Sequence, residues 1–261
     1  MQLIYEDNHI LAVSKTCHEI VQADRTGDEP LPETLKRFIK ERDHKPGNVF
    51  LGVTHRLDRP TTGIVLFAKT SKALERLNRM FATGEVHKTY WCIVAPLMPR
   101  MSGVTEEGWK KMSVLEQFAA AGIPLEQDLT HYLVRNEQQN RSYAYDTREE
   151  AARRNPKPQE ARLHYRVLSA TERYALLEVQ LYTGRHHQIR CQLSHIGLVI
   201  KGDLKYGAPR SNPDGGIALH SRRAVFVHPV SKQEVTLVAP IPDDALWHAL
   251  ADSLESKIDP E

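Results

Sequence analysis

The sequence predicts an α+β fold with a mixed, mainly antiparallel central sheet and flanking helices. Short apolar runs typical of strands outnumber helical segments, and the two types do not alternate as they do around a parallel sheet. The run over 174–182 places Leu177 and Val179 on one face and Glu178 and Gln180 on the other. A strand with one apolar and one polar face is typical of antiparallel pairing.

Apolar runs bounded by turn residues predict the strands. We expect a turn at Asp7-Asn8 between the first two, and a hairpin turn containing Pro229 and Ser231-Lys232 between the last two. The predicted strands cover residues 2–5, 10–14, 63–68, 90–95, 163–168, 174–182, 223–227 and 234–239.

Apolar residues at helical spacing predict helices at 32–42, 72–83, 186–196 and about 243–255. We expect the second helix to begin at a Ser71 cap and to end at Gly84. The side opposite its apolar stripe carries Lys72, Arg76 and Arg79.

The segment from about 98 to 160 has weak periodicity and many Glu, Gln, Arg and Asn residues. It predicts one helix near 114–121 and then a mobile loop through REEAARRNPKPQE. We interpret it as a variable insertion within a single catalytic domain over 1–245, followed by a C-terminal helix and tail over 246–261.

Length and composition are those of an ordinary soluble globular domain. The chain has 261 residues, of which 41% are apolar and 26% are charged. No stretch approaches the ~20 consecutive apolar residues of a membrane-spanning helix, and the start MQLIYEDNHILAVSK lacks the layout of a secretory signal. Cys17, Cys92 and Cys191 follow no ligand or disulfide spacing. These features predict a cytoplasmic protein with reduced thiols.

Charge is nearly balanced, at a formal net +2, but it is unevenly distributed. Such segregation is compatible with a basic face for nucleic acid and equally with an ordinary mixed surface. The basic residues are locally dense at Arg56/Arg59, Lys69/Lys72/Arg76/Arg79, Arg185/Arg190, Lys201/Lys205 and Arg222/Arg223.

The segment HRLDRPTTG, residues 55–63, is the most unusual in the chain. Asp58 lies between Arg56 and Arg59 and directly precedes a predicted strand. A close arginine lowers a carboxyl pKa by about 1–3 units and keeps the group ionised. An ionised carboxylate can act as a nucleophile, a base or a partner for a developing cation. From spacing alone, a structural aspartate paired with arginine is the commoner interpretation.

The same segment closely resembles the HRLD-x-x-TSG signature of the RluA-type pseudouridine synthase family. Further motifs similar to that family come later in the same order over roughly 1–95 and 160–245: GIVLFAKTSKAL, KTYW, TGRHHQIRCQLSHIGLVIKGDLKYG, ALHS and VFVHPVSKQEV. The resemblance implies a mixed, largely antiparallel sheet with a catalytic cleft and no cofactor or metal. It also implies isomerisation of uridine to pseudouridine in RNA.

The resemblance assigns roles to matching positions. Asp58 matches the catalytic aspartate, and Arg56 matches the arginine that approaches the space left by a flipped base. Tyr90 matches the tyrosine that packs against uracil, and Arg185 matches the arginine paired with the catalytic carboxylate. On the same basis, His55, Thr62, Ile189 and Leu219 are expected to bind substrate, and Arg59, Lys88, Arg190 and Lys201 are candidates for contacts with the RNA backbone.

Two positions depart from the family pattern. Thr62 stands where serine is common, and the segment SKTCHEIVQ replaces the usual NKP-x-G type of segment. Threonine and serine are both small and carry a hydroxyl, so we expect little effect of the first departure. The second departure affects the local turn.

The reaction itself needs no imported group. The glycosidic bond breaks, the base rotates, and a bond to carbon forms, so neither oxidation nor a cofactor is required. Because a stacked base cannot react, it must first be extruded into a pocket. Asp58 then either attacks the sugar or removes a ribose proton, and the sequence leaves both routes open. Tyr90 is a candidate base for the loss of the proton from C5.

Two other functions use parts of the same motif. A non-catalytic RNA-binding or chaperoning protein does not require the carboxylate of Asp58, and a hydrolase using Asp58 with His55 is a third hypothesis. No metal site is expected, because the adjacent His186 and His187 would point apart on a helix and the other histidines show no ligand spacing. The expected partner is ribosomal or transfer RNA, without membrane or small-molecule cofactor, and the expected state is a monomer.

No separate N-terminal RNA-binding module is expected, because the predicted core strands already begin within residues 1–14. Recognition is then expected to fall to the catalytic domain, with the 98–160 segment as a further candidate.

Overall fold

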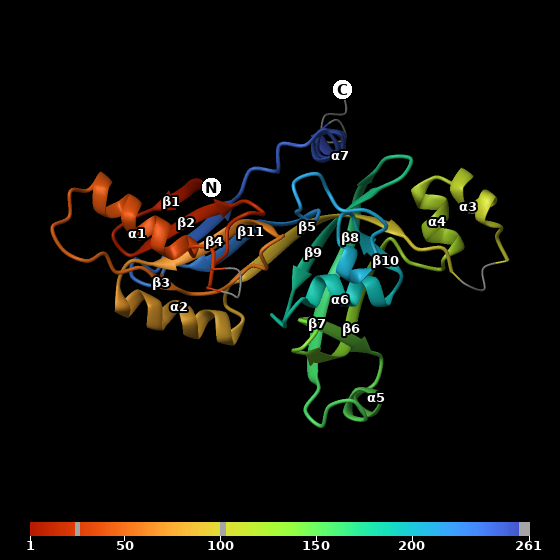
Figure 1. Ribbon diagram of the computed structural model, residues 1–261, viewed down its shortest axis with the longest axis horizontal. Coiled ribbons are helices and arrows are strands. Elements are labelled where there is room, and N and C mark those ends of the chain that lie inside the picture. The colour runs from red at the N-terminus through yellow and green to blue at the C-terminus, as the bar shows by residue number, and fades with distance from the viewer. Residues whose placement is uncertain (24–26, 100–102, 256–261) are drawn as a thin grey trace. The chain divides into compact units, whose positions relative to one another are not determined.

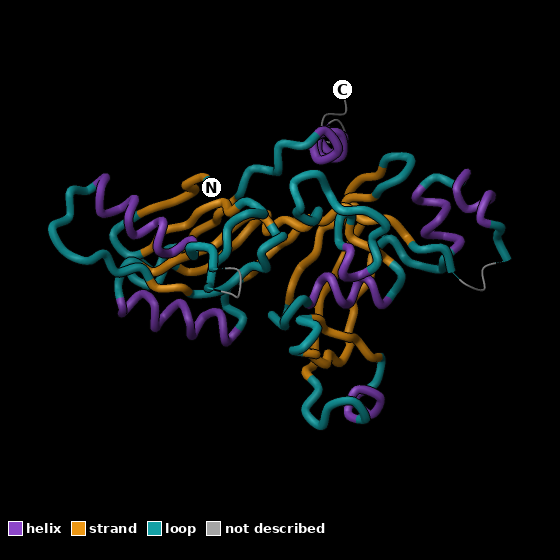
Figure 2. The backbone as a smooth tube through the Cα atoms, viewed as in Figure 1, coloured by secondary structure: helices purple, strands orange, loops and turns teal. Residues whose placement is uncertain are grey.

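The computed structural model describes residues 1–23, 27–99 and 103–255 (Figure 1). They form two compact units. The first comprises Met1–Lys88 and His220–Pro240, and the second comprises Thr89–Leu219 and Ile241–Glu261. Both units contain strands and helices, as Figure 2 shows.

The first unit is a sheet with two helices. Its strands are arranged in the order β1-β2-β4-β11-β12, and β3 pairs with β4. Its neighbours are antiparallel except for β4 and β11, which run parallel and pair Thr62 with His220 and Gly63 with Ser221. The elements are β1 (Gln2–Glu6), β2 (Ile10–Lys15), α1 (Leu31–Arg42), β3 (Gly52–Val53), β4 (Thr62–Ala68), α2 (Ser71–Thr83), β11 (Leu219–Val227, whose first residue belongs to the second unit) and β12 (Glu234–Val238).

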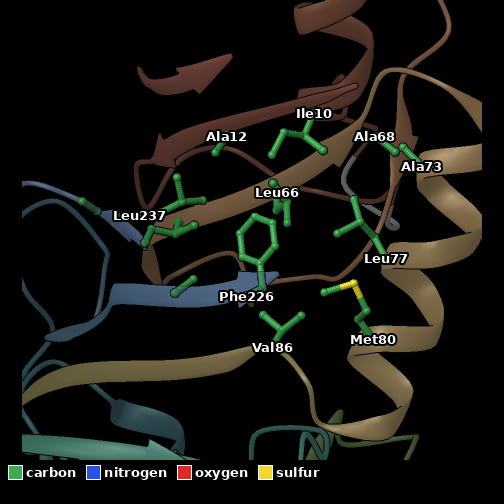
Figure 3. Close-up of a cluster of buried hydrophobic side chains, with 13 residues drawn as sticks. Ile10, Ala12, Leu66, Ala68, Ala73, Leu77, Met80, Val86, Phe226 and Leu237 are labelled. Carbon is green, nitrogen blue, oxygen red and sulfur yellow. The ribbon is translucent and has the colours of Figure 1, made fainter. Parts of the chain in front are cut away.

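The core of this unit lies between α2 and the sheet (Figure 3). Phe226 of β11 packs with Leu66 of β4 and with Leu77 and Met80 of α2, and all four are at most 4% exposed. Burying each such side chain contributes about 1.5–3 kcal/mol. The helix ends at Gly84, as predicted, in the left-handed conformation.

The start of α2 differs from the prediction. Its N-cap is Thr70 rather than Ser71, because the Thr70 hydroxyl accepts a hydrogen bond from the N–H of Ala73.

The second unit contains the order β10-β5-β9-β8-β6-β7. The pairs β10–β5, β9–β8, β8–β6 and β6–β7 are antiparallel. Its elements are β5 (His87–Pro96, whose first two residues belong to the first unit), α3 (Glu106–Lys111), α4 (Val114–Ala120), β6 (Glu126–Asn136), β7 (Arg141–Tyr145), α5 (Arg148–Ala152), β8 (Gln159–Ala170), β9 (Ala175–Leu181), α6 (Gln188–His195), β10 (Leu198–Ile200), the short 3₁₀ helix η1 (Leu204–Tyr206) and α7 (Ala245–Glu255).

The α+β prediction with a mixed, mainly antiparallel sheet is therefore confirmed. Within the described residues, no helix has the length and apolar character needed to cross a membrane.

The expectation for residues 98–160 is wrong in one respect. The helix near 114–121 exists as α4, but the chain beyond it is mostly regular structure rather than a mobile loop. REEAARRNPKPQE begins with α5 and ends in β8, while β6 and β7 extend the sheet. In β6 the buried residues Leu129, His131 and Leu133 alternate with more exposed ones. A histidine in the middle buried position hid this two-residue period from a search for apolar residues.

Gly63 provides a stability test of the parallel pairing. Its φ is +105°, and a Cβ there would lie 2.6 Å from the backbone N of Ser221 and would overlap the carbonyl oxygen of the same residue. Gly84 has a φ of +79° but open space around its missing Cβ. We expect Gly84→Ala to cost about 1–2 kcal/mol for the left-handed backbone alone, and Gly63→Ala to cost several kcal/mol more. Urea unfolding of both variants measures the difference, and equal losses would contradict the close approach.

Candidate active site

The loop between β3 and β4 carries Asp58. Leu57 is only 9% exposed, Asp58 is half-buried, and Arg56 is exposed. The N–H of Thr61 donates to the carbonyl oxygen of Asp58 at 3.0 Å, which closes a tight turn. The buried leucine and the closed turn fix the backbone that presents the carboxylate.

The side chain of a buried lysine donates hydrogen bonds to this turn. Lys15 is 1% exposed, and its Nζ donates to the carbonyl oxygens of Thr16, Arg59 and Thr61 at 2.7, 2.8 and 2.7 Å. Burial lowers the pKa of Lys15 to about 8, and the negative charge of Asp58 is among the influences that oppose this shift. At neutral pH the ammonium group still has three N–H donors for three carbonyls. Lys15 therefore ties the backbone just after Asp58, at Arg59 and Thr61, to the end of β2.

The two arginines that flank Asp58 contact the segment after β2. Arg56 donates to Oε1 of Gln22 at 2.6 Å, and Nη1 of Arg59 lies 2.7 Å from Oδ2 of Asp28. Both contacts are partly solvent-exposed, so each contributes about 1 kcal/mol or less.

His55 anchors the loop through its ring, and its expected contact with the substrate stays a prediction. The N–H of Leu66 donates to Nε2 of His55 at 3.0 Å, and the ring stacks on Phe81 with centroids 4.6 Å apart. Burial, with a smaller contribution from the Lys88 ammonium, lowers the pKa of His55 to about 3. Since Nε2 already accepts a hydrogen bond from the backbone N–H of Leu66, it is not positioned to serve Asp58 in a hydrolytic pair.

Lys88 itself is half-buried. Its Nζ lies 5.6 Å from the centre of the Phe81 ring, and burial lowers the pKa of its ammonium group.

Thr62 uses its hydroxyl inside the first unit. Its Oγ1 is 2.8 Å from Nδ1 of His220, a histidine that is 1% exposed. Burial, reinforced by the nearby Arg222, lowers the pKa of His220 to about 4. Thr62, which stands where the family pattern has serine, thus uses its hydroxyl to fix the end of the Asp58 loop to β11.

The remaining predicted residues belong to the second unit. Tyr90 on β5, Ile189 on α6 and Leu219 at the start of β11 are 6%, 4% and 4% exposed. Arg185 is exposed and precedes α6. Its Nε donates to the carbonyl oxygen of Glu160 and its backbone N–H donates to Oε1 of Gln188, both at 2.9 Å.

The expectation that His186 and His187 point apart on a helix is wrong. His187 is the N-cap of α6 in a left-handed conformation, and the two rings stack with centroids 3.8 Å apart. Nδ1 of His187 is 3.0 Å from the hydroxyl of Tyr206, and Nδ1 of His186 is 2.9 Å from Oγ of Ser142. The chain turns sharply before the helix and brings the rings together.

Arg190 has a buried carboxylate partner. It is 5% exposed, and its Nε and Nη2 bind the two carboxylate oxygens of Asp203 at 2.6 and 2.9 Å. The guanidinium also lies 5.1 Å from the centre of the Tyr206 ring. In this structure the guanidinium of Arg190 is thus engaged in a buried, bidentate pair with Asp203, and its expected contact with the RNA backbone stays a prediction. Lys201 remains half-buried, with its Nζ 2.7 Å from Oδ1 of Asn212.

One group of side chains has the composition of a metal site. Oδ1 of Asp146 lies 2.8 Å from Nε2 of His195 and 3.5 Å from Nε2 of His131. Nε2 of Gln192 donates to the carbonyl oxygen of Ala161 and lies 3.0 Å from Nδ1 of His131. Nδ1 of His131 is therefore the acceptor, and its ring proton is on Nε2, facing Asp146. This arrangement presents a proton rather than a lone pair, which does not suit a metal ligand.

Sequence reasoning missed Lys15 and Gln188. Both are buried polar residues, at 1% and 3% exposure, whose bonds go mainly to backbone groups. Both lie within or beside recognisable motifs, and that proximity is the available signal.

This fold and these motifs together define the class of an RNA-modifying isomerase. A family model described as RNA pseudouridylate synthase matches residues 9–195. Because this match covers more than half of the chain, the chain belongs to the RNA pseudouridylate synthase family, and its motifs are of the RluA type. It is accordingly an isomerase of the pseudouridine synthase class.

Curated relatives agree with this assignment. The chain is 28% identical over 258 residues to ribosomal large subunit pseudouridine synthase D of Xylella fastidiosa, covering 94% of this chain and 67% of the relative. It is also 28% identical to tRNA pseudouridine synthase C of Vibrio cholerae over 271 residues, or 96% and 94% of the two chains. The protein of the same name from Pectobacterium carotovorum is 28% identical, and the match spans 61% of its length.

A solved structure supports the fold. Human RNA pseudouridylate synthase domain containing 4 aligns with a TM-score of 0.69 at 22% identity, covering 97% of this chain and 93% of that one.

Replacing Lys15 by methionine tests the buried ammonium group. The change leaves the three carbonyls without their charged donor, so we expect a loss of about 3 kcal/mol or more in unfolding free energy. We also expect more than about a tenfold loss in the rate of pseudouridine formation, because small displacements of a reacting group are costly. Lys69→Met is the control. Lys69 is another lysine with protein partners, the carboxylate of Glu6 and the carbonyl oxygen of Asp7 at 2.6 Å each, but it lies away from the Asp58 loop. Equal effects of the two variants on rate would contradict the assignment.

Acid titration tests the anchoring role of His55. Its pKa of about 3 in the folded chain is below the value of about 6.5 in an unfolded chain. Between these values the unfolded chain binds the proton and the folded chain does not, so stability falls as pH falls. His55→Gln retains an acceptor for the N–H of Leu66 and does not titrate. We expect urea unfolding from pH 6.5 to 4 to show a smaller loss in this variant, and an unchanged slope would refute the buried neutral state.

Proposed function

We propose that this chain converts specific uridines to pseudouridine in structured RNA, either large-subunit ribosomal RNA or transfer RNA, with Asp58 as the essential residue. The observation that carries the proposal is the HRLD loop, whose half-buried aspartate is fixed by a buried lysine and a closed turn. Relatives named for each of these two RNA classes share about the same identity with the chain. Their names therefore do not favour one RNA class.

In the proposed mechanism the target base leaves the RNA stack before it reacts. Extrusion costs a few kcal/mol of unstacking, and Arg56 takes the vacated place. Arg56 suits this role because it is exposed and its guanidinium bonds to the neutral amide of Gln22. Exchanging a neutral partner for RNA leaves no buried charge unpaired.

Asp58 acts on the ribose of the extruded uridine. It either attacks the sugar, which forms a covalent bond while the base detaches, or removes a ribose proton and starts an elimination. In both routes the base turns and rebonds through C5, and the C5 proton is then lost. Lys15 holds the backbone that follows Asp58 during these steps, through the carbonyls of Arg59 and Thr61.

Tyr90, Ile189 and Leu219 are proposed to contact uracil, and Arg185 is proposed to keep the catalytic carboxylate ionised and oriented. Their burial supports an apolar contact for the first three, which are at most 6% exposed. Arg185 is exposed, with its backbone N–H and Nε already held. We further propose that both units serve this one activity as a single catalytic domain, because each carries part of the motif set.

RNA backbone contacts are proposed for Arg59, Lys88 and Lys201, together with the exposed Lys72 and Arg79 of α2. Such contacts make binding weaker as salt increases, since each neutralised phosphate releases counterions. We propose that the protein acts as a cytoplasmic monomer.

The central test compares Asp58→Asn with Asp28→Asn. Asp28 is a matched control, because it pairs with Arg59 of the same loop but is not proposed to react. RNA labelled with [5-³H]uridine, taken from cells that lack the gene, releases tritium when pseudouridine forms. We expect Asp58→Asn to abolish release and Asp28→Asn to retain most of it. Full activity of Asp58→Asn would refute the mechanism.

Mapping pseudouridines in cellular RNA identifies the target. The comparison uses cells with the gene, without it, and complemented by Asp58→Asn. The site should be present only with the intact enzyme. Restoration of the site by the Asp58→Asn protein would contradict the catalytic assignment.

A further inference from the structure

Gln188 occupies the first turn of α6 and is 3% exposed. A glutamine amide at such a position loses its water contacts, so its donor and acceptor need protein partners. The partners it makes all belong to the turn before the helix and to β8.

The amide of Gln188 is satisfied on both sides. Its Oε1 accepts from the hydroxyl of Thr183 and from the backbone N–H of Arg185, both at 2.9 Å. Its Nε2 donates to the carbonyl oxygen of Arg162 at 3.0 Å. Since one side meets a backbone N–H and the other a carbonyl, the orientation of the amide is fixed.

Thr183 and Arg185 are bound to the same stretch of β8. The Thr183 hydroxyl accepts from the N–H of Arg162 at 2.8 Å, while Nε of Arg185 donates to the carbonyl oxygen of Glu160 at 2.9 Å. Gln188 joins these contacts, because it binds Thr183, Arg185 and Arg162 at once. The side chain of Arg185 is therefore held at its base and at Nε although the residue is exposed.

We infer that Gln188 is a positioning residue for Arg185. This inference rests on the proposed role of Arg185 beside the catalytic carboxylate. With Nε committed to Glu160, Arg185 meets an anion through its two terminal amino groups. A guanidinium that is oriented in advance loses less conformational freedom when the anion binds.

Gln192 offers a matched control within the same helix. It lies one turn later, is 0% exposed, and also uses its amide for a backbone carbonyl and a side chain. Its amide bonds to Ala161 and His131 rather than to Arg185. Replacing either glutamine by methionine removes a buried amide from α6, so general damage to the helix should appear in both variants.

The kinetic test measures single-turnover tritium release from [5-³H]uridine-labelled RNA under saturating enzyme. We expect Gln188→Met to lower the rate by about tenfold or more, because misplacement of a catalytic group is costly, and Gln192→Met to leave it within about twofold. In an Arg185→Lys background, which has no Nε bond to lose, we expect Gln188→Met to have little additional effect. Equal losses for the two glutamines, or an undiminished loss in the Arg185→Lys background, would overturn the inference.

A second measurement does not depend on activity. The Nε–H proton of Arg185, assigned by NMR from its absence in Arg185→Lys, should exchange slowly in the parent chain and in Gln192→Met and quickly in Gln188→Met. Unchanged protection in Gln188→Met would overturn the inference. If this protection behaves as expected but Arg185→Lys keeps full activity, the positioning stands and the proposed role of Arg185 fails.

Discussion

The Asp58 loop depends on one buried ammonium group bound by three backbone carbonyls. A carbonyl turned inward without a donor would cost about 1–3 kcal/mol, so the loop can hide these groups only because Lys15 reaches them. The same constraint explains why lysine is tolerated at 1% exposure at the end of a strand whose first four residues are apolar and buried. Its charge also lies close enough to Asp58 for each to affect the other. One side chain thus holds the shape of the loop and places a positive charge near its carboxylate.

The second unit solves a similar problem with a neutral group. The turn ahead of α6 exposes backbone donors that the helix cannot satisfy by itself, and His187 at the cap adopts a left-handed backbone that is uncommon for a non-glycine residue. The amide oxygen of Gln188 accepts one of these donors, the backbone N–H of Arg185. Two residues further along α6, Arg190 pairs with Asp203. The exposed Arg185 is thus held by two contacts, from its backbone N–H to Gln188 and from its Nε to the carbonyl oxygen of Glu160.

Sequence pattern predicted the fold class and the positions of most elements because apolar periodicity survives in single strands and helices. It failed for β6, where His131 takes a core position, and it placed the N-cap of α2 one residue too late, because two adjacent hydroxyl residues could each cap the helix. Motif resemblance selected Asp58 and its neighbours, and it grouped Arg190 with Arg59, Lys88 and Lys201 as candidates for RNA backbone contacts. Arg190 shows the limit of that approach, since its carboxylate partner is thirteen positions away and only folding brings the two together.

The bond between Thr62 and His220 joins positions separated by 158 residues. The downstream end of the Asp58 loop is thus completed by a strand synthesised long after the loop itself. During translation, the nascent chain carries its aspartate for most of its synthesis without the strand that steadies it. The contact that Thr62 makes with His220 can therefore form only after β11 has been synthesised and has paired with β4.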